Sequence, residues 1–238
     1  MISNHDWDKW LERARVTPEV FALQPTYRAL LMVVDGLKPG ASDQFSDRLL
    51  SVAEVGARKT LAGRRPEDID ELAHWRDAYE SFGAKPKRTR PSVESLVRRV
   101  EAGLPRIDRV TDTYNAISVI HLLPVGGEDL DAYQGPPRLA RATGDEDFET
   151  VAKAEGVTDH PLPGEVVWLD DAGVTCRRWN WRQCTRTRIT QSTTRALFII
   201  DALGIGPEEP ERAGHHLVAA LRVFSPDLQV TQRLMTAA

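Results

Sequence analysis

The chain has 238 residues, of which 41% are hydrophobic and 28% are charged, and its net charge is −4. This composition is typical of a globular protein with a buried core and excludes a disordered chain. The small acidic net charge excludes a protein that coats nucleic acid through bulk positive charge. The chain has two cysteines, Cys176 and Cys184, which are too few to stabilise a chain of this length through disulfide bonds. A disulfide scaffold is therefore excluded.

The apolar stretches and the histidines of the chain exclude further classes. The first residues lack the apolar run behind a basic start that a secretory leader requires. The longest apolar stretch, residues 29–34, is too short to span a bilayer. The histidines and cysteines do not follow the spacing of a zinc site. We therefore expect a cytoplasmic protein that needs no membrane, metal or cofactor, and the oligomeric state stays open.

The N-terminal half alternates short strands with amphipathic helices. Strands are predicted over residues 20–23 and 27–34, and residues 29–34 are apolar on both faces, as in a central strand. Apolar residues at spacings of three and four predict five helices in this half. In chain order they cover residues 5–15, Ser42 or Asp43 through Val55, Pro66 to the break at Gly83, about Ser92 to Val100, and residues 110–122.

The C-terminal half is richer in strands. They are predicted over residues 137–142, 165–169, 174–179 and 196–200, followed by an amphipathic helix over 207–224. The polar stretch 143–163 is the best candidate for a loop. This mixture, without a long linker, predicts an α+β fold in which a mixed sheet is flanked by helices in one domain. We expect an N-terminal helix over 1–15, a main domain over 16–205, and a C-terminal helix within 206–238 that packs on the same domain.

Two segments concentrate positive charge. Residues 85–99 hold six cations and one acid, and residues 177–188 hold five arginines and no acid. The first segment is either an arm that contacts phosphates or a solvated entrance to a helix. In the second, two tryptophans alternate with polar residues. On a strand, Arg178, Asn180 and Arg182 would share one face that lines a pocket, while Trp179 and Trp181 would belong to the core. The alternative is that the two tryptophans are exposed and stack on bases or sugars.

A third polar segment interrupts an otherwise apolar helix. Asp112, Asn115 and Ser118 recur at a spacing of three residues, which predicts that they share one helix face. Residues 126–129, Gly-Gly-Glu-Asp, follow, and the two glycines predict a tight turn that exposes backbone N–H groups to a carboxylate or an oxyanion. Taken alone, the segment is more simply explained as a helix cap and a tight turn that serve the fold. The chain contains no P-loop, G-x-S-x-G or G-x-G-x-x-G motif, so an NTPase, a serine hydrolase of the usual kind and a dinucleotide enzyme lack support.

The order of these motifs resembles that of a known family. Residues 110–116, Val-Thr-Asp-Thr-Tyr-Asn-Ala, are followed by 124–131, then by 178–183, Arg-Trp-Asn-Trp-Arg-Gln, and then by a Thr-Arg-Ala-Leu-Phe strand from Thr194. This order is similar to that of the B3/B4 domain of the phenylalanyl-tRNA synthetase β subunit, in a freestanding form. The resemblance covers about residues 15–205, so the main domain over 16–205 is expected to be a B3/B4-like tRNA-editing domain.

The resemblance implies a role in the fidelity of translation. In the synthetase this domain is an editing module that hydrolyses the ester of wrongly made tyrosyl-tRNA, and a freestanding relative is expected to act in trans on a mischarged tRNA. The implied partner is the aminoacylated 3′ end of tRNA, not DNA. The residues assigned to these roles are, for catalysis, Asn115, Gly126, Gly127, Glu128 and Arg178; for substrate binding, Asp112, Ser118, Asp129, Asn180, Arg182 and Gln183; and for tRNA binding, Lys85, Lys87, Arg88, Arg90, Arg186 and Arg188.

The chain departs from the family pattern at two places, which leaves an alternative open. It has residues 126–129 where the synthetase has His-Ala-Phe-Asp, and the synthetase segment Gly-Gly-Glu falls near residues 182–184. A non-catalytic module that binds aminoacyl-tRNA or a free amino acid is therefore the second hypothesis. The charge distribution is compatible with both. The two basic segments carry +5 each, which leaves −14 on the rest of the chain, so tRNA would dock on a local basic surface.

Overall fold

The structure is a computed structural model that describes residues 4–152 and 154–237, with seven α-helices in these ranges. The helices are α1 (Asn4–Glu12), α2 (Pro18–Leu23), α3 (Gln44–Leu61), α4 (Asp70–Ser81), α5 (Ser92–Val97), α6 (Arg109–His121) and α7 (Glu209–Arg222). The strands are β1 (Arg15–Val16), β2 (Arg28–Asp35), β3 (Val125–Asp129), β4 (Arg138–Arg141), β5 (Phe148–Ala152), β6 (Glu155–Asp159), β7 (Val166–Leu169), β8 (Val174–Arg177), β9 (Arg182–Gln183), β10 (Arg195–Ala202) and β11 (Gln229–Met235). None of the helices in these ranges is long and apolar enough to cross a bilayer.

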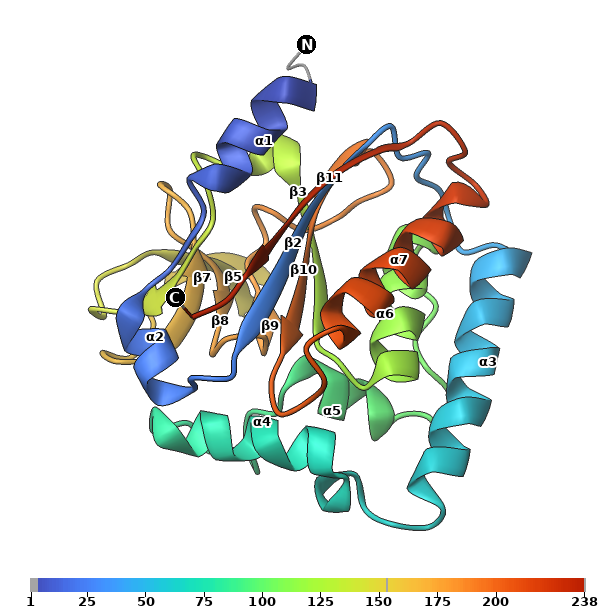
Figure 1. Cartoon of the computed structure of the whole chain (residues 1–238), viewed down its shortest axis with the longest axis horizontal. Coiled ribbons are helices and arrows are strands. Elements are labelled where there is room, and N and C mark those ends of the chain that lie inside the picture. Colours follow the sequence, from blue (N-terminus) through green and yellow to red (C-terminus); the bar gives the residue numbers. More distant parts are fainter. Residues whose placement is uncertain (1–3, 153, 238) are drawn as a thin grey trace.

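A four-stranded antiparallel sheet forms the centre of the molecule, with the strand order β11-β2-β10-β3. Its inner strands β2 and β10 are buried on both faces because their sequences are almost continuously apolar. Helices α6 and α7 cover one face of this sheet, and α3 packs on the outside of α6 (Figure 1). Asp43 begins α3 by accepting hydrogen bonds from the backbone N–H groups of Phe45 and Ser46, as its N-cap position predicts.

A five-stranded sheet packs against the other face, with the strand order β1-β4-β7-β8-β9. Strands β1 and β4 are parallel, and the remaining neighbours are antiparallel, so this sheet is mixed. The expected α+β fold, a mixed sheet flanked by helices, is confirmed.

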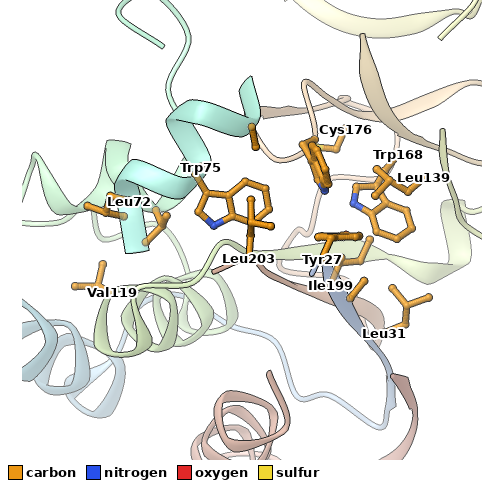
Figure 2. Packing of buried hydrophobic residues seen from close by; sticks show 14 of the residues in the cluster. Tyr27, Leu31, Leu72, Trp75, Val119, Leu139, Trp168, Cys176, Ile199 and Leu203 are labelled. Atoms are coloured by element: carbon orange, nitrogen blue, oxygen red, sulfur yellow. The ribbon is translucent and has the colours of Figure 1, made fainter. Parts of the chain in front are cut away.

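The core between the two sheets is aromatic. Tyr27 lies 4.9 Å from Trp179 and 6.4 Å from Trp75, measured between ring centroids, and all three side chains are almost completely buried. Trp75 reaches toward Tyr27 from α4 (Figure 2). Edge-to-face pairs of this kind add about 0.5–1.5 kcal/mol each to the free energy of burial. This rigid aromatic cluster forms the base of the candidate site.

Three elements differ from the sequence prediction. Residues 20–23 are not a strand but the end of helix α2, which Pro18 initiates because its fixed φ suits the first helical turn. The predicted loop over 143–163 contains the hairpin of β5 and β6, whose residues are mostly exposed and therefore lack an apolar signal. Strand β11, which follows α7 and pairs with β2, was not predicted, because its residues are largely polar.

Candidate functional site

A pocket of about 140 Å³ opens between the two sheets, and we call it the central pocket. Strands β3 and β10 form one wall, helix α6 another, and the segment joining β8 to β9 a third. The residues that line it are Ser92, Tyr114, Asn115, Val125, Gly126, Glu128, Trp168, Cys176, Trp179, Asn180, Arg182, Gln183, Ile199 and Asp201. Six of the residues assigned from the sequence therefore meet in one cavity: Asn115, Gly126, Glu128, Asn180, Arg182 and Gln183.

Glu128 is the most unusual of these residues. Its side chain lies on β3 and is only 2% exposed, yet its Oε2 atom has no hydrogen-bond partner among the described residues. Burial raises the pKa of this carboxyl to about 7, although the neighbouring polar side chains of Tyr133, Gln183 and Thr175 oppose the rise. A buried polar atom without a partner is costly. The arrangement therefore favours a ligand or a water that supplies the missing hydrogen bond.

The two glycines before Glu128 do not form the predicted turn. Gly126 and Gly127 belong to the edge strand β3 and pair with Ile199 and Phe198 of β10. At Gly127 a Cβ atom would come within 2.7 Å of Ile189 and 2.9 Å of Phe198, so close packing, and not a turn, explains this glycine. At Gly126 the nearest atom to such a Cβ is Nε2 of Gln183 at 3.9 Å. Gly126 therefore keeps the wall of the central pocket open.

A hydrogen-bonded chain of four buried side chains passes through the pocket. The hydroxyl of Tyr27 donates to Asp201 at 2.5 Å, and the amide of Asn180 donates to the other oxygen of Asp201 at 3.2 Å. The hydroxyl of Tyr79 donates to Oδ1 of Asn180 at 2.9 Å. Burial raises the pKa of Asp201 to about 7. The sequence reasoning missed Asp201, and the only signal was an acidic residue directly after the apolar run 196–200.

The segment after β8 is a turn and not the continuous strand that was predicted. Strand β8 ends at Arg177, and both Arg178 and Trp179 have positive φ angles, 48° and 67°, which reverse the chain before β9. Trp179 enters the core, as expected, with 0% exposure. Arg178 does not line the central pocket, because its side chain lies 3.5 Å from Glu165 outside it. The alternation assumed for a strand therefore does not hold here.

Three predicted substrate-binding residues also lie outside the central pocket. Asp112 is fully buried and accepts hydrogen bonds from Ser46 and from the backbone of Ile107, whereas Ser118 donates to the carbonyl of Leu123. A step of three residues falls about 60° short of a full helical turn, so positions 112 and 118 lie about 120° apart around the helix. Asn115, which lies between them, lines the pocket. Asp129, the third, caps a short turn and accepts from the hydroxyl of Thr193.

The six residues assigned to tRNA are divided by the fold. Lys85 and Arg88 line a second cavity together with Arg178. Lys87 is exposed beside them. Arg186 is held by two contacts of 2.8 and 2.9 Å with the buried Asp170, and Arg90 lies 3.6 Å from the buried Glu94, so both stabilise the fold. Arg188 is exposed, and its backbone pairs with that of Glu128.

The pocket offers no activated nucleophile and no metal-ligand set among the described residues. Burial raises the pKa of the Cys176 thiol well above its ordinary value, so the reactive thiolate is disfavoured. No group of three or more histidine, cysteine, aspartate or glutamate side chains in the described ranges is arranged to hold a metal ion. The polar groups available for chemistry are carboxyls, amides, the hydroxyls of Ser92 and Tyr114, and the guanidinium of Arg182.

The fold and the pocket together define a class of protein: an α+β domain with a small, polar, carboxyl-containing cavity between two sheets. A model of the B3/4 domain matches residues 74–204, more than half of the chain. The chain therefore belongs to the B3/4 domain family. The match begins in α4 and ends just after β10, so it includes every element that lines the central pocket.

Two further comparisons complete the description. A solved structure similar to the chain is an N-terminal fragment of the phenylalanyl-tRNA synthetase β subunit from Pyrococcus horikoshii, with 13% sequence identity and a TM-score of 0.46. The match covers 94% of this chain and 54% of that fragment, so the chain spans about half the length of its relative. None of the curated protein sequences is detectably similar to the chain.

Proposed function

We propose that the chain is a trans-editing deacylase, which hydrolyses the ester between a wrong amino acid and the 3′ end of its tRNA in the cytoplasm. The observation that carries the proposal is Glu128, a buried carboxyl with an unpartnered oxygen in a pocket that also contains unpaired donors. The relation of the family to the synthetase supports tRNA as the partner. The expected organisation, an editing domain over 16–205 flanked by the two terminal helices, is part of the proposal.

The residues of the pocket are suited to hydrolysis without a covalent intermediate. An aminoacyl ester is already activated, so it is enough to place a water molecule and to stabilise the developing oxyanion. Glu128, with a pKa of about 7, accepts a proton from this water as its oxygen attacks the ester carbonyl. The tetrahedral intermediate then collapses, the ribose oxygen leaves with the proton, and a free amino acid and an uncharged tRNA result.

Two side chains are proposed to stabilise the oxyanion. The amide of Asn115 and the guanidinium of Arg182 both line the pocket, and neither makes a hydrogen bond or ion pair with another described residue. Gln183 is less available, because its Nε2 already donates to the carbonyl of Gly127 at 2.7 Å. We propose that Gln183 orients the strand edge on which Glu128 lies. Arg178, which lies outside the pocket, takes no part in this step.

A non-catalytic binding module is the second candidate. The same unpartnered oxygen of Glu128 can accept a hydrogen bond from the ammonium group of an amino acid, and the pocket lacks a nucleophile. This candidate predicts saturable binding without release of products. Only turnover distinguishes it from the deacylase.

Hydrolysis of a panel of mischarged tRNAs tests the proposal. Loss of the general base in the Glu128→Gln variant is expected to lower the rate about 10²–10⁴-fold. The matched control is Glu211→Gln, which removes an exposed carboxyl on α7 and should keep the full rate. The rate should also increase with pH through about 7, because only the ionised Glu128 accepts a proton. Absence of hydrolysis for every pair, with saturable binding of one charged tRNA, would refute the deacylase and favour the binding module.

A further inference from the structure

A second cavity, of about 440 Å³, lies beside the central pocket, and we call it the basic groove. Lys85, Arg88 and Thr89, from the segment between α4 and α5, form one side. Arg178 and Glu165, from the five-stranded sheet and its turn, form the other. The two segments that the sequence marks as basic are therefore brought together at one place, although about ninety residues separate them.

The positive charge of the groove is only partly neutralised by the protein. Glu165, its acidic residue, is already paired with Arg177 through two contacts of 2.8 Å. Lys85 and Arg88 are exposed and form no ion pair with any described residue. Lys85 and Arg88 are therefore available to an anion, and Arg178, which lies 3.5 Å from Glu165, faces the same cavity with its charge shared with that carboxylate.

A column of three side chains connects the basic groove to the central pocket. The guanidinium carbon of Arg178 lies 4.4 Å from the ring centroid of Trp181, and that of Arg182 lies 4.5 Å from the same ring. Arg178 lines the basic groove and Arg182 lines the central pocket, so each cavity is lined by a cation that contacts the same indole ring. The half-buried Trp181 holds both cations in place, since a guanidinium is attracted to the face of an indole ring.

The backbone of the turn is shaped to build this column. Arg178 and Trp179 both adopt positive φ angles, a strained conformation that residues other than glycine rarely adopt. A strand without this turn would place Arg178 and Arg182 on one face, whereas the turn directs them to two different cavities. Contacts with the surrounding structure hold this strained backbone in place. They are the burial of Trp179 and the hydrogen bond that the backbone N–H of Arg178 donates to Glu165.

We propose that the basic groove binds a backbone phosphate of single-stranded RNA, one nucleotide away from the ester that occupies the central pocket. The proposal rests on the proposed function for the position of the ester, but the groove requires only an RNA 3′ end. Lys85, Arg88 and Arg178 contact the phosphate, and the Arg178–Trp181–Arg182 column lies beneath the terminal nucleotide. An RNA strand, and not an isolated phosphate, is the favoured ligand because Arg178 of the groove and Arg182 of the central pocket contact the same indole ring.

Binding of an uncharged RNA hairpin with a single-stranded 3′ extension, measured by fluorescence anisotropy, tests this site. The double variant Lys85→Ala/Arg88→Ala should raise the Kd at least tenfold and reduce the dependence of binding on salt. The matched control, Arg48→Ala/Lys59→Ala, removes two exposed cations from α3, which lines neither cavity, and should bind as the native chain does. A blunt hairpin and free AMP should bind weakly to every variant.

The outcomes separate this site from the proposed function. Equal losses in the two double variants, or tight binding of the blunt hairpin or of AMP, would overturn the RNA site in the groove. If no mischarged tRNA is hydrolysed but RNA binding is lost only in Lys85→Ala/Arg88→Ala, the groove stands and the deacylase does not. If hydrolysis occurs and this double variant binds and hydrolyses like the native chain, the groove is refuted and the deacylase stands.

Discussion

Replacing Glu128 by glutamine should stabilise the fold, and the gain should depend on pH. Burial raises the pKa of Glu128 from 4.5 to about 7, so the folded state holds the proton more tightly than the unfolded state does. The native chain therefore loses stability as pH rises from 4.5 through about 7, when a buried carboxylate must ionise. At about 1.36 kcal/mol for each pKa unit, this rise corresponds to a penalty of about 3 kcal/mol above pH 7.

The measurement is urea unfolding of the native chain and of Glu128→Gln at about pH 5 and about pH 8.5. Between these pH values the stability of the variant relative to the native chain should grow by about 2–3 kcal/mol, because most of the penalty develops in this interval. Glutamine has the same shape and no charge, so other titrating groups, Asp201 among them, cancel in the comparison. A difference in stability that does not change with pH would refute the inference that Glu128 is a buried, high-pKa carboxyl.

The other predictions concern packing and buried charge. Gly127→Ala should destabilise the fold by about 1–3 kcal/mol, since its Cβ would overlap Ile189 and Phe198, whereas Gly126→Ala should leave urea unfolding nearly unchanged and narrow the pocket. Arg177→Ala should lower the free energy of unfolding by about 3–5 kcal/mol, because Glu165, which is 3% exposed, loses its bidentate partner. The control Arg212→Ala, which breaks the exposed pair with Glu209, should cost less than about 1 kcal/mol. Equal losses in thermal or urea unfolding would contradict the conclusion that the buried pair contributes more than the exposed one. Tyr27→Phe should cost about 1–3 kcal/mol by leaving an oxygen of Asp201 without its donor, while an unchanged midpoint would show that this hydrogen bond contributes nothing.

The helices and strands that could be predicted from the sequence are those that are recognised by the residues of the element itself. The apolar run of β2, the Asp43 cap of α3 and the periodicity of α6 and α7 all depend on residues within one element. The polar strand β11 and the exposed hairpin of β5 and β6 have no such signal, because neither depends on burial of its own residues. Strand β11 is a strand because it pairs with the distant β2, and β5 and β6 are strands because a turn pairs them with each other. Propensity for strands depends strongly on such context.

The candidate site was predicted in part for a similar reason. Asn115, Glu128 and Arg182, which the sequence analysis assigned to one site, reach one pocket from three separate elements. Arg178 was misplaced because alternation on a strand was assumed where two positive φ angles make a turn. Asp201 was missed because its role is created by hydrogen bonds from Tyr27 and Asn180, which are distant in the sequence.

Counting charges along the chain overstates the positive surface that RNA can use. In the segment 177–188, Arg177 and Arg186 are occupied by buried carboxylates, so their charge is neutralised within the protein. In the segment 85–99, the buried Glu94 is shared among Arg76, Arg90 and Arg98. What remains for a ligand is a small set around the basic groove and Arg182, on a body that is otherwise acidic. Each phosphate contact lowers log K by about 0.7 for each tenfold increase in salt, so a set of this size supports a shallow salt dependence. In the proposed function, selectivity for one end of one RNA comes from the central pocket, where Glu128 and Arg182 are proposed to contact the ester.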